Sequence, residues 1–150
     1  MTIERTVGGV GADFATFYAA WAWIVGLGNL TNDYDFFQTG NTVEPGNTWD
    51  IGGLRVMGYT VRFICLWADS HKGDPTKGFT VTLPNVGTPT IRPEFYAWTE
   101  GIINVSGLYI INNYAGVAFH SASGLFEYDH LTVCENILID GRGVFGSYGL

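Results

Sequence analysis

Acidic side chains near the C-terminal end of the sequence are the residues best suited to acid–base chemistry. Glu127 and Asp129 are two positions apart, so on a strand they point to the same face. Asp140 and Arg142 follow, and a polysaccharide-active enzyme needs such groups together on one exposed face. The matching stretch one coil earlier, residues 104–106, is neutral. A solvated outer face explains the pattern better, so Glu127, Asp129 and Asp140 are weak catalytic candidates and a non-catalytic role is favoured.

Histidine and cysteine do not form a metal-binding pattern. His71, His120 and His130 lack short ligand spacing, and a zinc site needs more nitrogen or sulfur ligands nearby. Cys65 and Cys134 each lie in an alternating apolar run, which favours two buried thiols and leaves a disulfide as the alternative. We therefore expect neither a metal ion nor a cofactor.

The most polar part of the sequence, Trp67–Lys77, predicts an exposed loop. It contains Trp67, His71 and Lys72, and a further tryptophan, Trp98, also stands next to polar turn residues. Exposed aromatic side chains mark interaction surfaces, although both tryptophans could equally fill the core. The sequence thus offers Trp67, His71, Lys72 and Trp98 as candidate binding residues.

The composition of the 150-residue chain excludes several classes of function. Hydrophobic residues make up 47% and charged residues only 14%, and the formal net charge is −7. Phosphate contacts need clustered Lys and Arg, so we expect no nucleic-acid partner. No apolar stretch is long enough to span a membrane, so none is expected as a partner, and Met1–Arg5 lacks the apolar core of a signal peptide.

One amphipathic helix precedes a series of short strands. Apolar residues recur at helical spacing: Phe17, Ala20, Trp21 and Ile24. This spacing predicts a helix over about residues 16–26 with Thr16 as its N-cap. The strongest strand pattern is Tyr59–Leu66, and the 21 glycines indicate many turns.

A short pattern recurs along the chain and predicts stacked coils. The three copies are Ile51-x-x-Leu54-x-Val56, Val105-x-x-Leu108-x-Ile110 and Tyr128-x-x-Leu131-x-Val133. We expect Leu54, Leu108 and Leu131 to occupy equivalent inward positions, the last two 23 residues apart (108 to 131). Coils of this kind stack and pair in parallel because one coil cannot bury its own inward face. An antiparallel β-sandwich is the alternative.

Three segments resemble right-handed parallel β-helix proteins of the pectate-lyase-like type. The segment Val7–Ala20 is similar to the glycine-rich opening and Asp-aromatic-x-Thr run that leads into a capping helix in that family. The segments Asn104–Asn113 and His130–Asn136 resemble later coils. The resemblance implies an all-β, right-handed parallel β-helix with a short N-terminal capping helix. It implies one domain, with residues 1–33 as the opening segment and helix and residues 34–150 as coils that could begin a longer solenoid.

Proteins with this fold include polysaccharide-active enzymes and bacteriophage virion proteins, so the resemblance leaves more than one function open. The opening segment is closest to pectin methylesterase-like enzymes, which need two aspartates and an arginine on adjacent coils, and we find no such set in the sequence. The low charge favours the virion group. We therefore expect a structural protein of the tail spike, tail fibre or capsid-decoration kind, made in the host cytoplasm and located in the virion.

The scarcity of charge also predicts partners. So few charges cannot solvate the outer face, so we expect a homo-oligomer, with a trimer favoured, and contacts to other virion proteins. A host-surface polysaccharide is a further candidate partner. The alternatives are a polysaccharide-degrading lyase or hydrolase and a non-catalytic glycan-binding module on the same fold.

Overall fold

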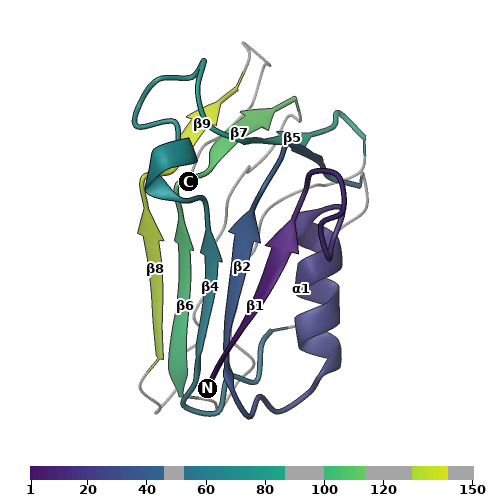
Figure 1. The fold of residues 1–150 in the computed structure, drawn as a ribbon, viewed down its shortest axis with the longest axis vertical. Helices are drawn as coiled ribbons and strands as arrows, with labels where there is room; N and C mark the ends of the chain where they lie inside the picture. The colour runs from purple at the N-terminus through teal and green to yellow at the C-terminus, as the bar shows by residue number, and fades with distance from the viewer. Residues whose placement is uncertain (46–52, 87–99, 114–129, 142–150) are drawn as a thin grey trace.

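Two parallel β-sheets and one α-helix form the described part of the molecule (Figure 1). The computed structural model describes residues 1–45, 53–86, 100–113 and 130–141. The larger sheet contains, in spatial order, β1 (Thr2–Val7), β2 (Asp33–Gln38), β4 (Thr60–Ile64), β6 (Gly101–Ser106) and β8 (His130–Glu135). The smaller sheet contains β3 (Thr42–Val43), β5 (Thr80–Leu83), β7 (Tyr109–Asn112) and β9 (Leu138–Asp140).

The chain visits the two sheets in turn and so builds a parallel solenoid of about four turns. From β2 onward, each strand of the larger sheet is followed along the chain by a strand of the smaller sheet. Every strand pairing among the described residues is parallel. The prediction of stacked parallel coils is confirmed, and the antiparallel sandwich is excluded for this part of the chain.

The predicted leucine repeat is wrong. Leu54 and Leu108 are buried, but Leu131 pairs with the outward-facing Ile102 and is 53% exposed. The true offset between the last two turns is 29 residues (105 to 134), because Val105 pairs with Cys134. The predicted offset of 23 residues (108 to 131) is six short of this, so it matched Leu108, at the corner between β6 and β7, with Leu131, an outward-facing residue of β8.

The helix α1 (Phe17–Gly26) lies beside β1, at the opposite end of the larger sheet from β8 (Figure 1). Its buried residues are the predicted ones: Phe17, Ala20, Trp21 and Ile24. Phe36 and Phe63, one turn apart, stack with ring centroids 4.7 Å apart and planes 9° apart. The ring of Trp21 lies 5.8 Å from that of Phe63, so the helix closes an aromatic core.

Two side chains accept hydrogen bonds from the first turn of α1. Thr16 is the N-cap, as predicted, and its hydroxyl oxygen accepts from Ala19 N at 3.1 Å. The buried Glu44 carboxylate, just after β3, accepts from Phe17 N at 3.2 Å and from Tyr18 N at 3.1 Å. These bonds satisfy amides that have no partner within the helix. Burial nevertheless raises the pKa of Glu44, because it outweighs the two backbone donors that lower it.

This raised pKa predicts how stability depends on pH. The folded state holds a proton on Glu44 at pH values where the unfolded chain, at its ordinary value of 4.5, has lost it. The unfolding free energy of the wild type relative to Glu44→Gln should be largest below pH 4.5 and should fall as pH rises through the raised pKa. Urea unfolding of both proteins across this range measures the difference. A difference that grows with pH would contradict the prediction.

Candidate functional site

The predicted polar loop, Trp67–Lys77, connects β4 to β5 and is called the Trp67 loop below. It starts with a 3₁₀ turn, Trp67–Asp69, and lies above the carboxyl ends of β6 and β8 (Figure 1). Trp67 is 68% exposed and Lys72 is exposed, whereas Ser70 and His71 are buried. The loop is therefore a surface feature with a buried anchor.

His71 is that anchor. Its Nδ1 accepts a hydrogen bond from Gly73 N at 2.8 Å, so its Nε2 carries the proton and donates to Asn136 O at 2.7 Å. Asn136 lies between β8 and β9, so this bond ties the loop to the last described turn. The backbone at Gly78 also packs closely against that of His71, because a Cβ on Gly78 would lie 2.5 Å from His71 N.

The exposed indole of Trp67 is held by a cation. Lys72 Nζ lies 4.8 Å from the centre of the Trp67 ring, within the range of a cation–π contact. Lys72 has a positive φ of 49°, a backbone conformation that non-glycine residues seldom adopt. The loop thus places the ammonium group over the ring and keeps both side chains at the surface.

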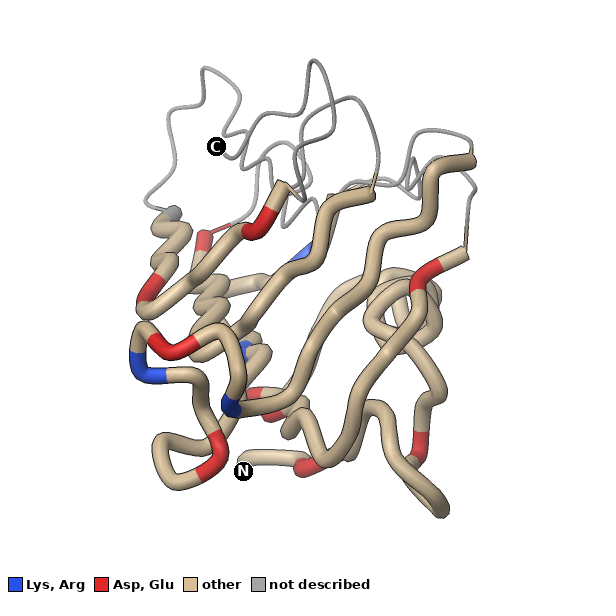
Figure 2. The backbone as a smooth tube through the Cα atoms, turned by 90° about the horizontal axis from the view of Figure 1, so that it is seen from above, with Lys and Arg blue, Asp and Glu red and all other residues tan. Residues whose placement is uncertain are grey.

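Two clefts flank the Trp67 loop. One, of about 410 Å³, has a mixed lining of apolar and polar residues: Ile64, Cys65, Trp67, Ser70, Ser106, Gly107, Glu135 and Asn136. The other, of about 470 Å³, is lined by residues that include Asp69, Lys72, Lys77 and Phe79. Figure 2 shows acidic and basic positions distributed along the described chain.

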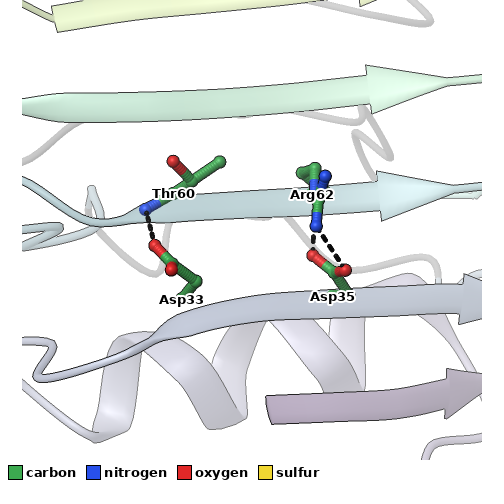
Figure 3. Close-up of polar contacts among 4 residues, drawn as sticks. All are labelled: Asp33, Asp35, Thr60 and Arg62. Carbon is green, nitrogen blue, oxygen red and sulfur yellow. Dashed lines mark hydrogen bonds and ion pairs between the residues drawn. The ribbon is translucent and has the colours of Figure 1, made fainter. Parts of the chain in front are cut away.

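The outer face of the larger sheet carries a second polar cluster that sequence reasoning did not find (Figure 3). Arg62 on β4 donates to Asp35 on β2 from Nε at 2.7 Å and from Nη2 at 2.6 Å. Asp33 Oδ1 accepts from Thr60 N at 2.9 Å. Glu4 on β1 is in register with Asp35. The bonds to Asp35 raise the pKa of Arg62 further above its ordinary range.

This cluster places two aspartates and an arginine on neighbouring turns, the set that we did not find in the sequence. Both Asp35 oxygens bind Arg62, and the Asp35 side chain is only 7% exposed. The arrangement favours a structural ion pair that crosses from one turn to the next. Once the parallel register is known, the 27-residue offset (35 to 62) identifies the pair.

The remaining candidates lie in different places. Asp140 is on β9, and its Oδ2 accepts from the Tyr109 hydroxyl at 2.8 Å. Glu127, Asp129 and Trp98 lie outside the described residues. The structure therefore brings Trp67, His71 and Lys72 together in one loop and gives no arrangement for the predicted carboxylate group.

The cysteines differ from the expectation of two buried thiols. Cys65 is buried, but Cys134 is exposed, and both are free. Cys134 occupies the inward position opposite Val105 in the last strand of the larger sheet. Among the described residues no later strand pairs with β8, which leaves this inward position open.

The described ranges contain neither a metal-binding cluster nor a membrane-spanning helix. No group of three or more His, Cys, Asp or Glu residues there could hold a metal ion. No helix in these ranges is both long enough and apolar enough to cross a membrane.

Comparison with models of protein families gives no match to this chain. Searches of curated proteins and of solved structures give none either.

The anchoring role of His71 predicts local opening when its ring is removed. His71→Ala leaves the Asn136 carbonyl and the Gly73 amide without these partners, at a cost of about 1 kcal/mol for each, because both hydrogen bonds are only partly buried. We expect the Gly73 amide to exchange with solvent at least about tenfold faster, as measured by hydrogen exchange NMR. Lys72→Ala, a change at the exposed neighbour, is the control. Equal protection in His71→Ala and wild type would contradict the anchor.

The Asp35–Arg62 pair predicts a measurable coupling energy. A double-mutant cycle with Asp35→Ala and Arg62→Ala should give about 1 kcal/mol, because the contact is bidentate but Arg62 is 45% exposed. Added salt should reduce this coupling, since one partner is reached by solvent. Urea unfolding at two salt concentrations measures it. A coupling energy of zero at low salt would show that the ion pair does not stabilise the fold.

Proposed function

We propose that this chain is a structural protein of the bacteriophage virion, of the tail spike, tail fibre or capsid-decoration kind, built as a right-handed, pectate-lyase-like β-helix. The observation that carries the proposal is the anchored Trp67 loop on a parallel solenoid. Its His71–Asn136 bond fixes a projecting surface to a stack of hydrogen-bonded turns. A scaffold of this kind suits a role that is mechanical and presents a surface.

An exposed apolar strip supports self-association. Ile102 on β6 and Leu131 on β8 pair in register on the outer face of the larger sheet, and they are 39% and 53% exposed. Val133 faces outward on the same strand. With 14% charged residues in the chain, packing this strip against another copy would remove apolar surface from water. A homotrimer in the virion is the assembly that we propose.

Light scattering on the full chain tests the assembly, and we expect a mass of three copies. Leu131→Glu should shift that mass towards one copy, because it places a charge in the contact. Val43→Glu is the matched control, since Val43 is an exposed apolar residue on the other sheet. A wild-type monomer would overturn the oligomer, and equal dissociation by both variants would overturn the contact through Leu131.

The virion assignment has its own test. Antibodies raised against the chain should label purified particles of the phage that encodes it, as seen by immunogold electron microscopy. Particles that carry none of this chain would overturn the assignment, whatever its oligomeric state.

A polysaccharide-active enzyme is the second candidate, favoured by Asp33, Asp35 and Arg62 on neighbouring turns of an outer sheet face. Its test is turnover of a panel of polysaccharides and their methyl esters. Activity that is lost in Asp33→Asn and kept in Thr2→Ala, at the end of the same face, would establish it. Absence of turnover across the panel would leave the cluster with its structural role alone.

A further inference from the structure

The cleft of about 410 Å³ beside the Trp67 loop, called the Trp67 cleft below, is built from two kinds of wall. One wall includes Trp67. The other follows one outward row of the larger sheet, in which Ile64, Ser106 and Glu135 pair in register across three turns. Residues far apart in sequence therefore meet here because the turns stack.

Backbone conformations that favour glycine shape the polar wall. Gly107 has a φ of +72°, and a Cβ there would lie 2.8 Å from Cys65 O, so the chain turns tightly against β4 after Ser106. Asn136 has a φ of +51° directly after Glu135. The His71–Asn136 bond then fixes the Trp67 loop to the same turn. Both walls of the cleft are therefore held together at Asn136.

The indole is prepared for a ligand on the cleft side. Lys72, whose ammonium lies over the ring, lines the other cleft and not this one. The cation limits the motion of an indole that is 68% exposed, which lowers the entropy lost when a ligand binds. An exposed tryptophan held this way is a ready planar surface for stacking.

The chemistry of the walls selects the ligand class. The electron-rich face of an indole attracts weakly positive C–H groups, as it attracts cations. The carboxylate of Glu135, the amide of Asn136 and the hydroxyl of Ser106 can bond to several hydroxyl groups. A purely apolar ligand would desolvate Glu135 without a partner, and an anionic ligand would meet its charge and the net charge of −7. A sugar without charge offers both C–H faces and hydroxyls.

We propose that the Trp67 cleft binds a neutral saccharide, with a pyranose ring stacked on Trp67 and its hydroxyls bonded to Glu135, Asn136 and Ser106. This inference deepens the proposed function by naming what the presented surface contacts, and it rests on that function only for its biological setting. Binding is a property of the full chain in solution and does not require a particle.

Binding to an array that holds neutral oligosaccharides, built from hexoses and N-acetylhexosamines, beside acidic ones tests the proposal. The array identifies a bound glycan, and isothermal titration then measures its affinity. We expect Trp67→Ala to weaken that affinity about tenfold or more and Trp67→Phe to retain most of it, because phenylalanine keeps a stacking face. Glu135→Ala should also weaken it, by about tenfold. Val43→Ala, at an exposed residue on the other sheet, should leave it unchanged.

Three results would overturn the saccharide site: no binding to any neutral glycan, stronger binding to acidic glycans, or affinity that survives Trp67→Ala undiminished. Circular dichroism and unfolding of each variant establish that the fold is intact. The particle-labelling experiment is independent of these outcomes. A chain that labels particles and binds no neutral glycan therefore refutes the site alone, and the reverse result refutes the virion role alone.

Discussion

In-register parallel pairing is the constraint on which this structure depends. Each strand of the larger sheet places its side chains directly above those of the previous turn. The residue type at one position therefore restricts which residue can occupy the paired position on the next turn. Phe36 over Phe63 on the inside and Asp35 beside Arg62 on the outside are two results of the same register. The core and the outer surface are therefore set by one ladder, and neither can shift without the other.

The second constraint is that polar groups at the corners must find partners where the chain changes sheets. Gln38 faces inward at the end of β2, and its amide nitrogen donates to Gly40 O at 3.1 Å and to Thr80 O at 3.3 Å. Glu44 does the same for the first amides of α1. These buried side chains replace backbone bonds that the sheets cannot make at a corner. The bond from Gln38 to Thr80 O joins one turn to the next.

Local pattern predicted local structure, and it did not predict the spacing of the turns. The helix was visible because Phe17, Ala20, Trp21 and Ile24 repeat at helical spacing. The first strand was not visible, because Arg5 faces inward there, 5.6 Å from the Trp23 ring, and so interrupts the apolar alternation. The leucine pattern failed because successive turns differ in length, with offsets of 27 (34 to 61), 42 (61 to 103) and 29 (103 to 132) residues. Without a fixed period, neither the Asp35–Arg62 pair nor the cleft beside Trp67 could be assembled from the sequence.

The longest of these offsets shows how the fold accommodates an insertion. The turn that contains the Trp67 loop is longer than its neighbours, yet the strands before and after it keep their pairing: Ile64 with Ser106, and Thr80 with Tyr109. Extra chain is thus absorbed at a corner, outside the hydrogen-bonded ladder. The His71–Asn136 bond and the bond from the Asn136 amide to Ser70 Oγ join the added segment to the turn that contains β8 and β9. A different loop could therefore replace the Trp67 loop at this corner, provided that it keeps a hydrogen bond to a later turn. The contact surface of the molecule would then change while the paired strands stay the same.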